Sequence, residues 1–231
     1  MRKGLLTLVP TRNRVENALG LLDTFYKTSV ESSSGLLFVV GTEDPRYDEY
    51  VRRIPRGHLF VFPDRGLVRA LNHVAPLFVA EYEAIGFMGD DHRPRTVGWD
   101  RNYLGSLRRM GAGYVYGNDL LMGERIPTQV AISSEIIRSL GFFGPPGFTH
   151  LCVDLTWKDM GEGLGRIEYL PDTIVEHMHP AAGKARNDKG YKFVNSPEMV
   201  AKDSAEYYRW KEEDLPRELE CVARHLDSLG L

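Results

Sequence analysis

The sequence predicts an α/β domain built around a doubly wound parallel sheet. Between residues 4 and 88, short apolar runs alternate with segments of helical periodicity. The apolar runs are continuous, which is typical of strands that are buried on both faces. Polar clusters follow three of these runs: PTRNR, TEDP and GDDHR. Because parallel strands end at the same edge of a sheet, we expect the three clusters to converge on one crevice.

The first half supplies the regular part of this pattern. Strands are predicted at 4–9, 36–41, 58–62 and 84–88. A helix is expected after Arg14, because Val15, Leu19 and Leu22 recur at a spacing that places them on one face. Further helices are predicted at 47–53 and 65–78.

The second half is less regular. Helices are predicted at 99–110, 134–140 and 150–160, and strands at 113–117, 127–133, 166–170 and 173–179. The segment 181–191 is polar and contains glycine, which indicates a mobile loop. From Ser196 the chain is charged and carries Tyr207, Tyr208 and Trp210, so we expect two packed helices there.

Composition bounds the function classes. The chain has 231 residues and a net charge of −3, so it offers no polybasic surface for nucleic acid. Cys152 and Cys221 lie outside any C-x-x-C pair and favour a reducing compartment. The apolar run at 5–9 is too short for a signal peptide, and no segment approaches the ~20 apolar residues of a membrane span. We expect a cytoplasmic protein without a membrane span.

Adjacent carboxylates stand where the fourth predicted strand ends. Asp90 and Asp91 follow that strand after one glycine, and His92 comes next. Charges at this place cost desolvation energy unless they are paired or bound to a metal, and neighbouring carboxylates also repel each other. Their oxygens suit Mg²⁺ or Mn²⁺. A solvated loop in which an aspartate pairs with Arg93 or Arg95 is the alternative that this motif alone leaves open.

Two histidines close a later apolar run. His177 and His179 are two residues apart and therefore share one face of a strand. Taken with the acidic pair, His177 is a candidate ligand in a mixed oxygen and nitrogen metal site. Taken alone, both would be surface histidines.

Asp154 lies in an otherwise apolar turn close to Trp157. A carboxylate in such a place either caps a helix or acts as a base with a raised pKa. We favour the base, because the turn and Trp157 would form a natural pocket wall. Asp159 and Glu162 are the alternatives.

The PTRNR segment at 10–14 follows the first strand. Thr11 and Asn13 can cap the next helix, and the arginines can reach a phosphate at its N-terminus. The sequence contains no G-x-G-x-x-G, G-x-x-x-x-G-K-[ST] or G-x-S-x-G motif. Dinucleotide-binding, P-loop and α/β-hydrolase functions therefore lose their main support.

Together these motifs resemble the inverting glycosyltransferases of the GT-A fold, of the large family-two type. The resemblance runs along the chain to Pro180. Two of the family's features, PTRNR and an acidic loop after the second strand, occur here at 10–14 and 42–44. The family's Gly-x-x-x-A-x-N helix is matched loosely by RGLVRALN at 65–72. Its D-x-D or D-D-x metal motif corresponds to Asp90-Asp91-His92. VDLTW at 153–157 corresponds to E-D-x-x-W, and Y-x-P-D-x-x-V-x-H is matched from Tyr169 to His177.

The departures from the family pattern are also informative. Val153 stands where the family often has Glu, and His92 where a third Asp is common. The Gln-x-x-Arg-Trp motif of processive members is absent, which indicates a transferase that adds a single sugar. GDDHRPRTVGWD combined with EHMHP resembles a sub-group from bacteriophages and actinobacteria; a phage-encoded member would work in the host cytoplasm.

The resemblance implies a mixed central sheet with helices on both faces. Residues 1–180 would form the GT-A domain, with 1–92 as the nucleotide-binding half and 93–180 as the acceptor half. Residues 181–231 would add a mobile loop, which closes over the donor, and a helical appendage.

The resemblance also implies the chemistry. Mn²⁺ or Mg²⁺ held by Asp91 and His177 would neutralise the leaving nucleotide diphosphate, and Asp154 would deprotonate the acceptor hydroxyl. The implied nucleotide-binding residues are Pro10, Thr11, Arg12, Arg14, Asp44, Arg65 and Asp90. Additional candidates are His92, His179, Lys184 and Trp157.

The partners implied are a UDP- or GDP-type sugar donor and an acceptor that is a protein, a glycan or a small molecule. A homodimer through the aromatic tail is left open. The first alternative function is a non-catalytic nucleotide- or carbohydrate-binding domain, followed by a metal-dependent phosphohydrolase. A sugar-phosphate nucleotidyltransferase is disfavoured, because PTRNR has no glycine to cradle a triphosphate.

Overall fold

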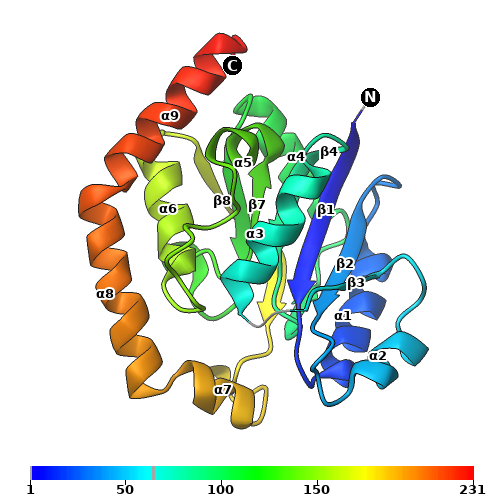
Figure 1. Ribbon diagram of the computed structural model, residues 1–231. Helices are drawn as coiled ribbons and strands as arrows, with labels where there is room; N and C mark the ends of the chain where they lie inside the picture. The colour runs from blue at the N-terminus through cyan, green and yellow to red at the C-terminus, as the bar shows by residue number, and fades with distance from the viewer. Residues whose placement is uncertain (1, 64–65) are drawn as a thin grey trace.

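The computed structural model describes residues 2–63 and 66–231, and its centre is a sheet with the strand order β3-β2-β1-β4-β7-β6-β8-β5 (Figure 1). The parallel part consists of β1 (Lys3–Pro10), β2 (Gly35–Val40), β3 (Leu59–Val61) and β4 (Tyr82–Phe87). These are the four strands predicted from the first half of the sequence. Their carboxyl ends all point to the lower end of the molecule in Figure 1.

The other half of the sheet is mixed. β7 (Val130–Ser133) lies antiparallel between β4 and β6 (Tyr114–Asn118). β8 (Ile167–His177) is parallel to β6, and β5 (His92–Pro94) is antiparallel to β8. The prediction of a mixed α/β sheet is therefore confirmed.

Helices cover both faces of the sheet. One face carries α1 (Val15–Thr28), α2 (Tyr47–Arg53) and α4 (Trp99–Arg109), which share a buried cluster with Leu5 and Val9 of β1. The other face carries α3 (Leu67–Phe78), α5 (Ser134–Leu140) and α6 (Val153–Gly163), which share a second cluster with Leu6 and Leu8. Adjacent residues of β1 thus serve opposite cores, as the period of two in a strand requires. Helices on both sides explain why the strand sequences are continuously apolar.

The C-terminal segment forms α8 (Pro197–Glu213) and α9 (Leu215–Ser228), which run along the left edge in Figure 1. Trp210, Val222 and Leu226 belong to the core cluster of the α3 face, so both predicted helices pack on the sheet domain. Trp210 Nε1 donates to Glu218 Oε2 at 3.0 Å and ties the two helices together. The division of the chain at residue 180 remains a prediction.

Four local expectations need correction. The two strands predicted at 166–170 and 173–179 are one strand, β8, whose register on β6 shifts at Gly117/Asn118. The short strand β5 was not predicted. α6 begins at Val153 rather than at residue 150, because Cys152 has a φ of +63° and breaks the helical conformation.

The fourth correction concerns the predicted mobile loop 181–191. Its first residues belong to the 3₁₀ turn η2 (Pro180–Ala182), and its last three belong to helix α7 (Lys189–Val194). A second 3₁₀ turn, η1 (Gly123–Arg125), follows β6. None of the described helices combines the length and the apolar character needed to cross a bilayer.

Candidate functional site

The loops after β1 and β4 meet at the carboxyl edge of the sheet through a chain of hydrogen bonds. Thr11 Oγ1 donates to Asp90 Oδ2 at 2.6 Å and lies 2.9 Å from the Tyr50 hydroxyl. Because the Thr11 proton is committed to Asp90, Tyr50 donates to Thr11. Tyr50 in turn accepts from the Arg14 N–H at 2.9 Å. Backbone and side chains of the PTRNR segment are thereby fixed onto the acidic pair, as the sequence predicted.

Asp90 is buried in this network at 5 % exposure. Arg14 Nη1 lies 3.5 Å and Asn17 Nδ2 3.4 Å from its Oδ1. Burial, reinforced by the adjacent Asp91, raises the pKa of Asp90 to about 6, although Arg14 and Thr11 oppose the shift. Two adjacent buried carboxylates repel each other, and an additional positive charge beside them would reduce this repulsion.

Asp91 meets two histidine rings. His177 Nε2 and His92 Nδ1 each lie 3.5 Å from Asp91 Oδ1, and the two rings stack with centroids 4.3 Å apart. Burial alone would raise the pKa of Asp91, but the contact with His177 holds it well below its usual range. Asp91 is therefore an ionised carboxylate, the form that a cation requires. One donor atom from each of the three residues lies within 4.8 Å of the others, so the group could hold a metal ion.

The two histidines differ in their fitness as ligands. The Gly89 N–H donates to His92 Nδ1 at 3.0 Å, so that lone pair is already used, and burial lowers the pKa of His92. His92 Nε2 then carries the proton and faces Thr128 Oγ1 at 3.4 Å. In contrast, His177 Nδ1 is buried without a hydrogen-bond partner and lies 3.9 Å from Asp119 Oδ2. A carboxylate at the second nitrogen is the usual companion of a metal-binding histidine. Asp91 and His177 are the better pair, with His92 packed behind them.

Asp119 is a residue that the sequence reasoning missed. It follows β6 and is 1 % exposed. Its Oδ1 accepts the N–H groups of residues 121, 122 and 123, and its Oδ2 accepts from Thr128. Burial disfavours its charge, but these donors hold the pKa below its usual range. The His177 N–H donates to the Asp119 carbonyl at 2.9 Å, which fixes the end of β8 beside the acidic pair. The only signal in the sequence was an Asp at the end of an apolar run.

The acidic loop at 42–44 is joined to this centre through the loop after β1. Asp44 is 5 % exposed and accepts the N–H groups of Asn13 and Arg46 at 2.8 and 2.7 Å. Arg12 Nη1 pairs with Glu43 Oε1 at 2.8 Å. The loop after β2 is thereby joined to the loop after β1, where Pro10 ends the strand.

Asp154 lies in the first turn of α6 and is half-buried. Burial raises its pKa, although the Leu155 N–H and the charge of His177 oppose the shift. Of the two alternatives, Asp159 is engaged by Lys211 and the Tyr207 hydroxyl, and Glu162 is largely exposed. Asp154 is the carboxylate of α6 that suits a proton acceptor.

A buried aspartate of α8 holds the loop in front of α6. Asp203 is 0 % exposed and accepts three consecutive N–H groups, from Thr149 at 3.1 Å, His150 at 2.8 Å and Leu151 at 2.7 Å. The loop carries His150, whose pKa burial lowers to about 4, with the charge of Arg14 acting in the same direction. The charges of Asp203 and Asp91 oppose this shift. Neither Asp203 nor His150 was singled out from the sequence.

The remaining predicted residues have other surroundings. Trp157 is 2 % exposed and donates to the Phe143 carbonyl at 3.0 Å, so it lies in the core and does not line a pocket. Lys184 Nζ pairs with Glu176 at 2.6 Å. His179 stacks edge-on against His177 and accepts the Ala181 N–H. Arg65 lies outside the described residues.

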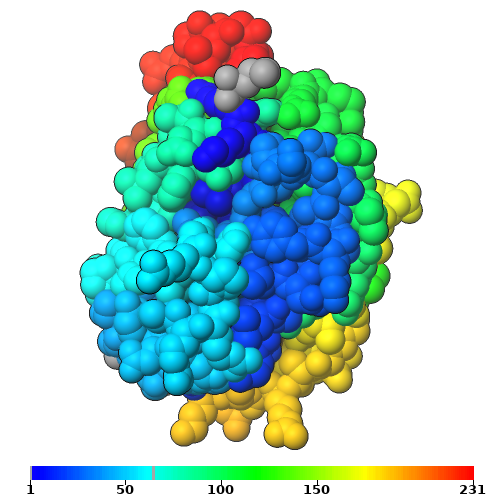
Figure 2. Space-filling model, turned by 90° about the vertical axis from the view of Figure 1, so that its right-hand side faces the viewer, coloured from blue at the N-terminus to red at the C-terminus, as the bar shows by residue number. Residues whose placement is uncertain are grey.

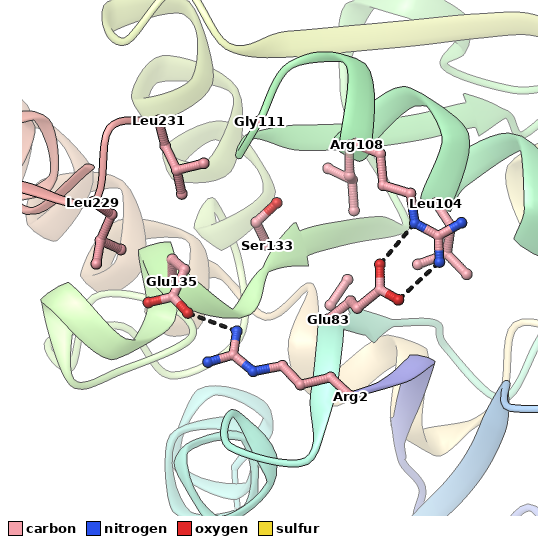
Figure 3. A pocket seen from close by; sticks show the side chains of 11 residues that line it. Arg2, Glu83, Leu104, Arg108, Gly111, Ser133, Glu135, Leu229 and Leu231 are labelled. Atoms are coloured by element: carbon pink, nitrogen blue, oxygen red, sulfur yellow. Dashed lines mark hydrogen bonds and ion pairs between the residues drawn. The ribbon is translucent and has the colours of Figure 1, made fainter. Parts of the chain in front are cut away.

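A pocket of about 240 Å³ lies at the opposite end of the sheet, where β1 and β4 begin (Figure 3). Both of its arginines are paired: Arg2 with Glu135 at 2.6 Å, and Arg108 with Glu83 at 2.7 Å. Its charges are therefore neutralised, and none of the predicted site residues lines it.

Comparison with solved structures identifies the architecture. A mannosyltransferase from Pyrobaculum calidifontis, solved with GDP-Man and Mn²⁺, matches with a TM-score of 0.65 and 16 % identity over 100 % of this chain and 76 % of the other. TarS 1-349 of S. aureus with UDP-GlcNAc matches with a TM-score of 0.58 and 15 % identity over 90 % and 72 %. The catalytic domain of Drosophila beta1,4galactosyltransferase 7 matches with a TM-score of 0.53 and 13 % identity over 87 % and 80 %.

The chain has the GT-A fold of nucleotide-diphospho-sugar transferases. No family model and no curated protein sequence matches it. At these identities the likeness establishes the fold alone. In an open α/β sheet ligands bind beyond the carboxyl ends of the strands. The network of Thr11, Asp90, Asp91 and His177 lies at that edge.

Proposed function

We propose that this protein is a metal-dependent, inverting glycosyltransferase that moves one sugar from a nucleotide-diphosphate donor to an acceptor hydroxyl. The observation that carries the proposal is the pair formed by ionised Asp91 and His177, whose second nitrogen has no hydrogen-bond partner. Two protein ligands at the carboxyl edge of the sheet suit Mn²⁺ or Mg²⁺, which complete their coordination with water and substrate phosphates. When bound, the ion would neutralise charge on the departing diphosphate.

The residues around the pair provide the donor site. Arg14 presents a guanidinium, 18 % exposed, above Asp90 and Asp91, where it can bind a phosphate through two N–H groups. Thr11, Asp90 and the loop containing Arg12 and Asp44 hold the nucleoside side of the donor, with Pro10 ending the strand beneath it. The donor nucleotide is UDP or GDP.

Asp154 provides the base. Its raised pKa makes it a better proton acceptor than an exposed carboxylate, and it belongs to the first turn of helix α6. It would take the proton of the acceptor hydroxyl while that oxygen attacks the anomeric carbon from the side opposite the diphosphate. The configuration at that carbon inverts, as in the family-two glycosyltransferases that the sequence motifs resemble.

The test measures donor turnover and donor binding separately. Purified protein would be incubated with UDP- and GDP-sugars and Mn²⁺, and release of the nucleotide followed by mass spectrometry. Asp154→Asn is expected to lower the rate by about 10²–10⁴-fold with nucleotide affinity retained. Glu162→Gln, on the exposed side of the same helix, is the matched control and should keep both. Nucleotide binding without turnover in the wild type would instead support the non-catalytic binding domain.

A further inference from the structure

Helix α7 and the residue that caps it cover the candidate site, through contacts with Arg14 and Asp91. Asp188, which caps this helix, accepts from Arg14 Nε at 2.9 Å and from Arg14 Nη2 at 2.8 Å. Tyr191 lies three residues further, with the Arg14 guanidinium 4.1 Å from its ring centroid. Figure 2 shows the segment, in yellow to orange, against the blue surface of the N-terminal residues at the lower end of the molecule.

Asp188 uses the two donors of Arg14 that a phosphate would use. Carboxylates and phosphates both bind the guanidinium fork through two parallel hydrogen bonds. A donor diphosphate can therefore reach these N–H groups only when Asp188 leaves them. Gly190 leaves room for this approach, because a Cβ at that position would lie 3.2 Å from both Arg14 Nη2 and Asp188 Oδ1.

Tyr191 acts in the same way on the predicted metal ligand. Its hydroxyl donates to Asp91 Oδ2, the oxygen that does not face the histidines. Tyr191 is 8 % exposed, so the contact is enclosed. A cation on Asp91 needs the lone pairs of that carboxylate, and one of its two oxygens is engaged by the phenol.

Resting on the proposed function, we infer that the segment 188–191 is a latch that keeps the donor site closed, with Asp188 in place of a donor phosphate on Arg14 and Tyr191 competing with the cation for the lone pairs of the Asp91 carboxylate through its second oxygen. Metal and nucleotide diphosphate displace it together. Their apparent affinities are lowered by the fraction of molecules in which the latch is closed.

Two variants open the latch with little other change. Asp188→Asn removes the ionic pair with Arg14 and keeps a good helix cap for the Tyr191 N–H, which Asp188 accepts at 3.0 Å. Tyr191→Phe removes the hydroxyl on Asp91 and keeps the ring on Arg14. The matched controls are Asp227→Asn, an exposed carboxylate on α9, and Tyr208→Phe, a tyrosine that is 69 % exposed on α8.

The experiment measures binding of GDP and UDP by calorimetry with Mn²⁺, and binding of Mn²⁺ alone from the electron paramagnetic resonance signal of the free ion. Asp188→Asn should bind the nucleotide at least about 5-fold more tightly than the wild type, and Tyr191→Phe should bind Mn²⁺ more tightly. Hydrogen exchange of the amides at 188–195 should rise in the wild type when the nucleotide binds.

The outcomes separate the latch from the proposed function. If the wild type binds a nucleotide while both variants bind it equally or more weakly, and exchange at 188–195 is unchanged, the latch is wrong and the donor site stands. If neither the wild type nor any variant binds a nucleotide with or without Mn²⁺, both proposals are wrong. Binding by Asp188→Asn alone would support both.

Discussion

Replacement of Asp203 by alanine should loosen the loop that leads into the Asp154 helix. The carboxylate belongs to α8, more than 50 positions away from the three N–H groups that it accepts. Alanine leaves these groups without an acceptor in a place where the side chain had no exposure. The loop 149–151 would then lose its attachment to the C-terminal helices.

The magnitude follows from the balance of two effects. Hydrogen bonds to a charged acceptor contribute about 1.5–3 kcal/mol each, so the three bonds give a gross loss of about 5–9 kcal/mol. Removal of a buried carboxylate recovers several kcal/mol of desolvation energy. A net loss of about 3 kcal/mol in the free energy of unfolding is expected. Asp203→Asn should lose about 2 kcal/mol, because its single oxygen can still serve His150 and Leu151 while its amide faces the Thr149 N–H.

The assay is urea unfolding at neutral pH, followed by circular dichroism. Lys202→Ala is the control: Lys202 is the neighbouring exposed residue, which donates to Thr149 Oγ1, and its loss should change stability by about 0.5 kcal/mol or less. A loss below about 1 kcal/mol in Asp203→Ala would refute the reasoning, since it would mean that the three N–H groups find water at no cost.

Three further predictions concern pH, packing and catalysis. The pKa of His150 is about 4 in the folded protein and about 6.5 in the unfolded chain, so the unfolded state binds a proton first as the pH falls from 6.5 to 4, and stability should decrease. In parallel urea titrations over this range, the wild type should lose up to about 3 kcal/mol more in its free energy of unfolding than His150→Gln. Gly117→Ala should destabilise the protein by about 2 kcal/mol or more, because the added Cβ would clash with the Thr173 carbonyl oxygen. Gly105→Ala in α4 meets only a side-chain atom at 3.7 Å and should stabilise the protein by up to about 1 kcal/mol. Thermal denaturation measures both changes. Once the donor sugar is identified, Asp154→Asn should lose turnover while calorimetry still detects nucleotide binding. An equal loss of turnover and of nucleotide binding would mean that Asp154 binds the donor and is not the base.

The sheet and most helices could be predicted because their signals are local. The boundaries of α2 and α5 agree with the predicted ones, since each is set by the residues that compose it. The break at Cys152 could not be predicted, because a positive φ at a residue other than glycine depends on the surrounding packing. β5 was missed for a similar reason: three residues with a charged centre pair with β8 only once the acidic loop has folded back.

The site was predictable where it follows the ends of strands. Thr11, Arg14, Asp90, Asp91 and His177 come together because parallel strands deliver their following loops to one edge. The sequence could not indicate that a tyrosine from a polar segment would reach Asp91 across 100 positions, or Asp188 reach Arg14 across 174. These contacts depend on the path of α7, and no local pattern encodes that path.

Trp157 illustrates the limit for aromatic residues. An aromatic side chain beside a candidate base is compatible with a pocket wall and with a core position. The structure places it between Phe87 and Phe143, with ring centroids 5.4 and 5.5 Å away, and gives its N–H a carbonyl partner. Which face of α6 turns inward is decided by packing against β4 and the loop 141–148, and the sequence alone does not reveal it.

The most direct test of a metal-bound diphosphate is calorimetric binding of GDP and UDP to the wild type and to Asp91→Asn and His177→Gln, each with and without Mn²⁺. We expect one nucleotide to bind the wild type only when Mn²⁺ is present, and each substitution to abolish this binding. Binding that is equally strong without Mn²⁺, or that survives in both variants, would contradict a metal-bound diphosphate at Asp91 and His177.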